Sequence, residues 1–152
     1  MTKRTRFSAS SSPAILAVIC GLAILVVTAP FATSDFVMAQ QQPATKVTSL
    51  MSKVIAEFPG REIVVITLDI PPGGGSPPHR HPGNHNFGYV LEGAYRIKLD
   101  DGPETVLTKG QTFYEAPGQL HAVSSNGSQT EPAKVLVFIV AESGKPLTVP
   151  EK

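Results

Sequence analysis

Short apolar segments separated by glycine and proline run through the chain from Ile63 onward, and they constrain its fold more than any other feature. A β-branched segment from Ile63 to Ile70 (IVVITLDI) stops at a PPGGG turn that begins at Pro71. The segment from Tyr95 to Leu99 alternates apolar and charged residues, which is the period of a half-buried strand. Because no segment shows the period of an amphipathic helix, we expect an all-β domain, either a sandwich or a barrel.

The remaining strand candidates are bounded by the same turn residues. They are the two parts of Phe87–Leu99 on either side of Gly93, Val106–Leu107, Thr112–Tyr114, His121–Val123 and Lys134–Ala141. The segment from Leu50 to Phe58 fits either a helical turn or a strand, and the tail from Glu142 to Lys152 fits an edge segment or a loop. We therefore expect a linker and a first strand in residues 40–60, followed by a single barrel domain in residues 61–152.

Residues 1–39 have the composition of a secretory signal peptide. Three basic residues within the first six precede an apolar centre from Ala14 to Ala29, and the small-residue site Val37-Met38-Ala39 follows. A retained membrane anchor is the alternative, although the apolar centre is short for a span, which takes about 20 residues. We expect a secreted or periplasmic protein that touches a membrane only if this leader is retained.

Charge and cysteine content exclude several classes of function. The chain has 13 Lys and Arg against 12 Asp and Glu, a formal net charge of +1. This balance provides no basic face, so we expect no nucleic-acid partner. The single cysteine, Cys20, lies in the leader. The domain itself therefore has neither a disulfide framework nor a cysteine-based zinc cluster.

The four histidines of the chain are grouped in a way that favours a metal site. His79, His81 and His85 lie within seven residues, and His121 is the only other histidine. In a strand, side chains two positions apart point to one face, so His79 and His81 can direct two imidazoles to one point. Imidazole is the commonest metal ligand in proteins. The alternative is a solvated histidine-rich loop or partly buried core histidines.

At these residues the sequence resembles the cupin family. Its first motif is a glycine, five residues, His-x-His, three or four residues, a glutamate, six residues and a glycine. Gly73, His79-Arg80-His81 and Gly93 fit this pattern. Its second motif is a glycine, five residues, Pro-x-Gly, two residues, a histidine, three residues and an asparagine. Gly110, Ala116-Pro117-Gly118 and His121 fit, with Ser125 at the asparagine position. The two motifs occur in the family's order and lie within a stretch from Ile63 to Ala141.

The resemblance implies a double-stranded jelly-roll β-barrel in which His79, His81 and His121 surround a metal. It also implies a small-molecule ligand or substrate and a homodimer. The metal would be one divalent transition ion, Fe, Mn, Ni, Cu or Zn, because imidazole suits all of them.

One departure from the first motif concerns the metal ligands. The family's glutamate is absent: counting four residues from His81 places Asn86 there, whereas counting three places His85 there. The second count leaves one residue too many before Gly93, so it requires a bulge. Histidine is the better ligand, and we expect His85 to join His79, His81 and His121 in a four-histidine site. Asn86 stays the alternative.

Small metal cupins resemble dioxygenases of phenolic or enol substrates, and this is the activity we expect. The alternative is a non-catalytic module that binds or senses a metal or a small ligand. Glu115 is the acidic residue beside the second motif, and we expect it to be a solvated carboxylate at a strand end rather than a general base. Phe87, Tyr89, Phe113 and Phe138 would line an aromatic pocket or, more simply, fill the barrel core.

Overall fold

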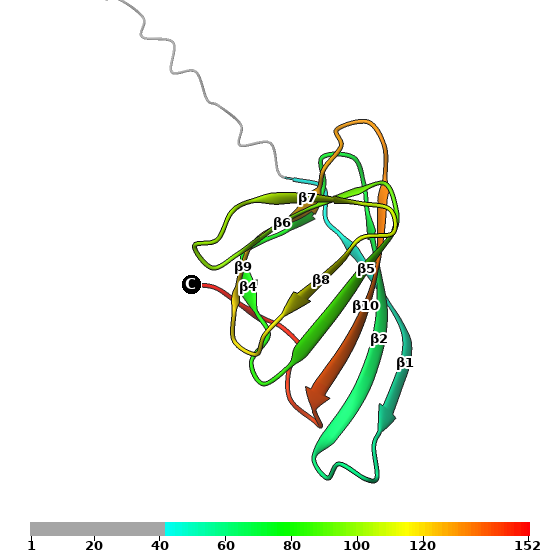
Figure 1. Ribbon diagram of the computed structural model, residues 1–152, viewed down its shortest axis with the longest axis vertical. Coiled ribbons are helices and arrows are strands. Elements are labelled where there is room, and N and C mark those ends of the chain that lie inside the picture. Colours follow the sequence, from blue (N-terminus) through cyan, green and yellow to red (C-terminus); the bar gives the residue numbers. More distant parts are fainter. Residues whose placement is uncertain (1–41) are drawn as a thin grey trace, which may run out of the picture. The chain divides into compact units, whose positions relative to one another are not determined.

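The computed structural model describes residues 42–152, which fold into two antiparallel β-sheets (Figure 1). The predicted signal segment, residues 1–39, lies outside the described residues, and so does the alternative of a retained anchor. Across residues 42–152 no helix is long and apolar enough to cross a membrane. The expected all-β fold is confirmed.

The two sheets exchange strands along the chain. The first sheet has the order β1(Lys46–Val54), β2(Arg61–Ile70), β10(Ala133–Glu142), β5(His85–Glu92) and β8(Thr112–Glu115). The second has the order β11(Val149–Pro150), β4(His79–Arg80), β9(Leu120–Asn126), β6(Ala94–Leu99) and β7(Thr105–Thr108), and β3(Gly75–Ser76) also pairs with β9. Consecutive strands such as β5 and β6 lie in different sheets, which is how a jelly roll encloses its interior.

A tight turn at Gly93 carries the chain from β5 to β6. Gly93 has a φ of 69°, and a Cβ at this position would lie 2.3 Å from the carbonyl oxygen of Pro132. Both facts require glycine, since other residues rarely adopt this φ and none would fit the space. The predicted break between two strands at Gly93 is therefore confirmed.

The core lies between the sheets and is built by strict alternation. Along β10, Ala133, Val135, Val137, Ile139 and Ala141 are buried. Phe138 between them is 38% exposed. The strand predicted from Lys134 to Ala141 thus turns only one of its faces to the core.

The aromatic residues of the first sheet and the segment before Val54 differ from what the sequence pattern indicated. Phe87, Tyr89 and Phe138 do not fill the core: they project from the outer face of the first sheet, where they line an open depression, and are 38–46% exposed. The reason is register: their inward-facing neighbours in the sequence occupy the interior. The segment that fitted a helical turn or a strand is a strand as far as Val54, and that strand, β1, begins at Lys46.

Candidate metal centre

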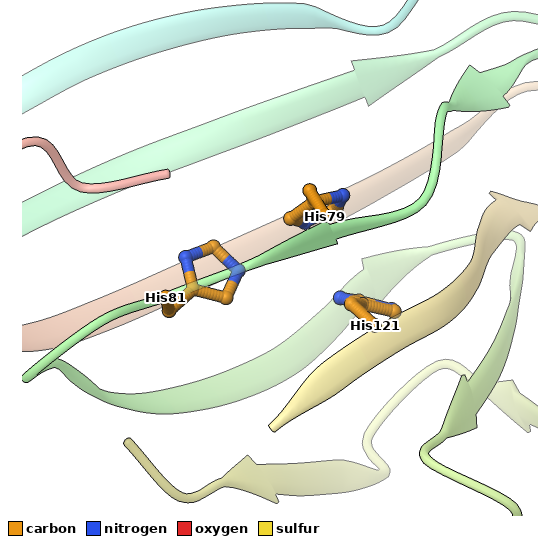
Figure 2. A group of neighbouring side chains, drawn as sticks. All are labelled: His79, His81 and His121. Carbon is orange, nitrogen blue, oxygen red and sulfur yellow. The ribbon is translucent and has the colours of Figure 1, made fainter. Parts of the chain in front are cut away.

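Three histidines meet at one point where β4 and β9 pair. His79 and His121 are directly opposite each other in this ladder, and their ring centroids are 4.9 Å apart. His81 follows β4, and its ring centroid also lies 4.9 Å from that of His79. Figure 2 shows the three rings converging from the two strands. One nitrogen from each ring can be chosen so that all three lie within 4.8 Å of one another.

Backbone carbonyl groups hold two of these rings. His79 Nδ1 lies 2.8 Å from the carbonyl oxygen of Pro77, and His81 Nδ1 lies 2.7 Å from that of Leu147. Because a carbonyl oxygen only accepts, Nδ1 of each ring is the donor. In its neutral form, each ring therefore presents an unprotonated Nε2 with a free lone pair. Metal-binding histidines are oriented in the same way, by a hydrogen bond from the nitrogen that does not bind the metal.

The pKa of His79 is lowered, chiefly because burial disfavours the charged ring. The hydrogen bond to Pro77 opposes this shift, while the neighbouring His121 and His81 add to it. His79 is therefore held in the neutral form, which is the form that binds metals.

His121 is buried between a tyrosine and a carboxylate. The hydroxyl of Tyr95, itself buried, lies 3.3 Å from His121 Nε2 and 2.8 Å from Ser124 Oγ. Burial raises the pKa of the Tyr95 phenol, so it stays protonated. His121 Nδ1 is buried without a hydrogen-bond partner. The alternating pattern predicted a strand at Tyr95, but its position beside this ring depends on the pairing of β6 with β9 and has no local signal in the sequence.

The expectation that Glu115 is a solvated carboxylate is wrong, because its carboxylate is buried inside the barrel. The residue is 3% exposed. Its Oε1 lies 3.1 Å from His121 Nδ1 and its Oε2 lies 3.3 Å from His81 Nε2. The amide of Asn86 donates to Oε2 over 3.0 Å. The sequence placed Glu115 at a strand end, but which face of β8 looks inward depends on pairing with β5.

Glu115 stays charged despite its burial. Burial alone would raise the pKa of its carboxyl group, but the neighbouring His121, the Asn86 amide and His81 together outweigh burial and lower the pKa.

The structure places His85 away from the histidine group. Its Nδ1 lies 2.8 Å from the hydroxyl of Tyr114, and the two rings are stacked with centroids 6.1 Å apart. This is the outer face of β5, where Phe87 is also exposed. Asn86, the next residue, is buried and faces inward. The four-histidine arrangement expected from the sequence is thus not formed, because no bulge in β5 reverses the alternation at His85.

A cavity of about 460 Å³ opens beside the three histidines. Its walls come from both sheets and are mainly apolar. The apolar lining includes Ile66, Leu68, Phe113, Val137, Ile139 and Leu147. Among the described residues that line it, Glu115 is the single carboxylate, and there is no Lys or Arg. This is the common form of a small-molecule site, with apolar walls and a few polar groups at one place.

The donor set fits a divalent transition metal. Two rings donate from Nδ1 and leave Nε2 available to a metal, the third has a buried nitrogen without a partner, and a carboxylate lies against two of the rings. Imidazole and carboxylate ligands together suit Fe, Mn, Ni, Cu and Zn.

Comparison with known proteins gives one family. A family model described as "Cupin domain" matches residues 66–139. The chain is 32% identical over 106 residues to oxalate oxidase GF-3.8 from Triticum aestivum, covering 63% of this chain and 46% of that protein. It is 30% identical over 115 residues to germin-like protein subfamily 2 member 2 from Arabidopsis thaliana, covering 68% of this chain and 52% of that protein. The chain thus spans about half the length of these curated relatives.

Solved structures show the same fold. A recombinant oxalate oxidase in complex with glycolate matches with a TM-score of 0.53 and 28% identity, over 70% of this chain and 54% of that chain. A protein with a double-stranded beta-helix domain from Klebsiella pneumoniae subsp. pneumoniae matches with a TM-score of 0.56 and 23% identity, over 72% of this chain and 86% of that chain. The expected jelly-roll barrel is confirmed.

Proposed function

We propose that the chain is a cupin and a metal-dependent oxidoreductase that binds its metal through His79, His81 and His121, which the family model over residues 66–139 and the histidine cluster support. The substrate class we propose is a small phenol or enol, oxidised in a dioxygenase-type reaction. The observation that carries the proposal is the convergence of three histidines on the polar end of an apolar cavity.

A divalent transition metal, when bound, supplies a Lewis acid with coordination positions left open for substrate oxygens. The chain's own residues supply the rest. The carbonyl groups of Pro77 and Leu147 orient His79 and His81, and the buried Tyr95 hydroxyl contacts His121. Rings held in this way need no rearrangement when a ligand enters, which is the preorganisation that catalytic sites require.

The cavity walls favour a substrate with an apolar body. Ile66, Leu68 and Phe113 would exclude water around a phenolic or enol ring, while the polar end receives the oxygen atoms. Oxalate, the substrate named for two of the similar proteins, carries two negative charges. No Lys or Arg is among the described residues that line this cavity, so nothing there would neutralise a dianion besides the metal. We therefore favour phenols and enols over oxalate.

The cellular location belongs to the same proposal. The leader-like composition of residues 1–39 supports secretion or export to the periplasm. The cysteine-free sequence after residue 39 is compatible with such an oxidising compartment.

Metal analysis followed by an oxygen-uptake assay tests this function. We expect about one equivalent of transition metal per chain, and loss of that metal in the His79→Ala and His121→Ala variants. The metal-loaded protein should consume O₂ with members of a panel of flavonols, catechols and enols, and more slowly or not at all with oxalate.

The outcomes separate the candidate functions. Stoichiometric metal without O₂ uptake on any substrate would favour the non-catalytic binding or sensing module. Unchanged metal content in both histidine variants would overturn the site itself. Uptake with oxalate alone would contradict the substrate class inferred from the cavity walls.

A further inference from the structure

We infer that Glu115 on β8 is the carboxylate ligand of this metal site, replacing the glutamate that the family motif carries at the position of Asn86. The inference rests on the proposed metal site and adds to it a ligand that comes from a different strand. It would convert the expected all-histidine site into one with three histidines and one carboxylate.

The strand register brings Glu115 to the position that the motif leaves without a carboxylate. Asn86 on β5 and Glu115 on β8 are directly opposite each other in the antiparallel ladder. Both side chains are buried and face the interior. Opposite residues in such a ladder have their Cβ atoms about 5 Å apart. The Glu115 carboxylate therefore lies beside the Asn86 side chain, whose amide donates to Oε2 over 3.0 Å.

The contact between the Glu115 carboxylate and His81 is the contact expected between two ligands of one metal ion. His81 Nδ1 donates to the carbonyl group of Leu147, so the neutral form of the ring presents the lone pair of Nε2, the form in which imidazole binds a metal. That Nε2 lies 3.3 Å from Glu115 Oε2, which also offers only lone pairs. Two electron-rich atoms at this separation repel each other unless a proton or a cation lies between them. A shared metal ion satisfies both.

The second oxygen has a similar relation to His121. Glu115 Oε1 approaches His121 Nδ1 to 3.1 Å, yet this nitrogen is buried without a hydrogen-bond partner. The carboxylate is therefore close to the ring but does not accept a well-directed hydrogen bond from it. A residue that only oriented His121 would accept such a bond. The arrangement instead resembles two ligand atoms on neighbouring positions of one coordination sphere.

Charge supports the same assignment. Burying a carboxylate is costly unless a positive charge or several hydrogen bonds compensate it. Glu115 has one hydrogen bond from the Asn86 amide, and its other neighbours within reach are imidazoles. Among the described residues that line the cavity there is no Lys or Arg. A divalent metal at the histidines supplies the missing positive charge.

The test compares the metal affinity of Glu115 variants and of a matched control variant with that of the wild-type chain. Glu115→Gln has nearly the same shape and removes the charge, whereas Glu131→Gln makes the same change in charge at an exposed position. We measure affinity for Mn²⁺ and Co²⁺ by competition with a chelator, and ligand geometry from the Mn²⁺ EPR and Co²⁺ absorption spectra. We expect Glu115→Gln to weaken binding at least 10- to 100-fold, roughly the loss seen for residues that merely support a ligand, and to alter both spectra. Glu131→Gln should match wild type.

A cross-strand exchange distinguishes a ligand from a positioning residue. The double variant Asn86→Glu with Glu115→Asn moves the carboxylate back to β5 and keeps the composition of the ladder. If the carboxylate binds the metal, the exchange should recover most of the affinity that Glu115→Asn alone loses, together with a Co²⁺ spectrum close to that of wild type. The unfolding midpoint of each metal-free variant, measured by circular dichroism, verifies that it folds.

The same measurements test separately whether Glu115 is a metal ligand and whether the histidines bind the metal. Wild-type affinity and spectra in Glu115→Gln, with metal lost in His79→Ala, would overturn the carboxylate ligand and leave the histidine site intact. An exchange variant that folds but binds no better than Glu115→Asn would also overturn it. Metal bound equally by all of these variants would overturn both.

Discussion

At the scale of single residues, the orientation of the histidine rings depends on partners at very different distances along the chain. Pro77, which holds His79, lies two residues away, so this contact is local. Leu147, which holds His81, lies 66 residues away on the C-terminal tail. Asn84 also donates to the Leu147 carbonyl over 3.1 Å. The tail therefore contributes to the site by orienting His81 through a backbone carbonyl group, although none of the proposed metal ligands lies in it.

The His85→Ala substitution tests the assignment of ligands at this scale. Because the His85 ring stacks on Tyr114 at the outer face, we expect the variant to bind metal with wild-type stoichiometry and affinity. His79→Ala serves as the matched change within the cluster and should lose the metal. The measurement is metal content after dialysis, with elemental analysis. A loss of metal from His85→Ala comparable to that from His79→Ala would restore the four-histidine site expected from the sequence.

At the scale of strands, the β5–β8 ladder shapes the cavity as well as the ligand set. Gly88 on β5 is opposite Phe113 on β8. A Cβ at Gly88 would lie 2.0 Å from the Phe113 ring, so the aromatic side chain occupies the space that the glycine leaves free. Phe113 also lines the cavity, and its ring stacks on Tyr95 with centroids 5.3 Å apart. The glycine thus allows an aromatic wall beside the metal centre.

We expect Gly88→Ala to destabilise the domain by about 1–3 kcal/mol, the usual cost of extra volume in a packed interior. Urea denaturation of the metal-free protein measures this change. The double variant Gly88→Ala with Phe113→Leu should recover part of the loss, because the smaller side chain leaves room for the new methyl group. If the changes in the free energy of unfolding of the two substitutions simply add, the position of the Phe113 ring does not depend on the space left by Gly88.

At the scale of the whole molecule, the candidate site joins the two sheets. The three histidines belong to the second sheet or its connection, whereas Glu115 belongs to the first. A metal bound by all of them would tie the sheets together and stabilise the folded state by mass action. The outer face of the first sheet carries Phe87, Tyr89, Tyr114 and Phe138, all exposed. The homodimer implied by the cupin resemblance stays a prediction.

The stability of the metal-free domain should fall as the pH is lowered. The pKa of His79 in the folded state is lower than its ordinary value of 6.5, and that of Glu115 is lower than 4.5. For both groups the unfolded chain binds protons more readily, so their contribution to stability is complete above these values and is lost as the pH falls. We expect a first decrease below about pH 6.5 and a second below about pH 4.5.

Thermal denaturation of chelator-treated protein between pH 8 and pH 3 (roughly the range that spans both groups) measures this profile. His79→Gln has no titrating ring, so it should flatten the first decrease and keep the second. An unfolding midpoint that rises as the pH is lowered from neutrality would contradict the direction of both shifts.

Much of this molecule could be read from local pattern. The segment that became β2, the break at Gly93 and the Lys134–Ala141 strand were predictable because alternation and turn residues act within a few positions. The spacing of His79, His81 and His121 within two motifs was equally visible. The position of His85 was not, because a shift of one residue in register exchanges the two faces of a strand.

The all-β domain and the grouping of three histidines in two motifs follow from short-range periodicity and spacing, so both are predictable from the amino-acid sequence. The inward position of Asn86 rather than His85, the exposure of Phe87 and Phe138, and the burial of Glu115 beside the histidines are visible only in the folded chain. Each of these outcomes depends on the pairing of β5 with β10 and β8. Such pairing joins segments that are distant in sequence, and no local pattern specifies its register.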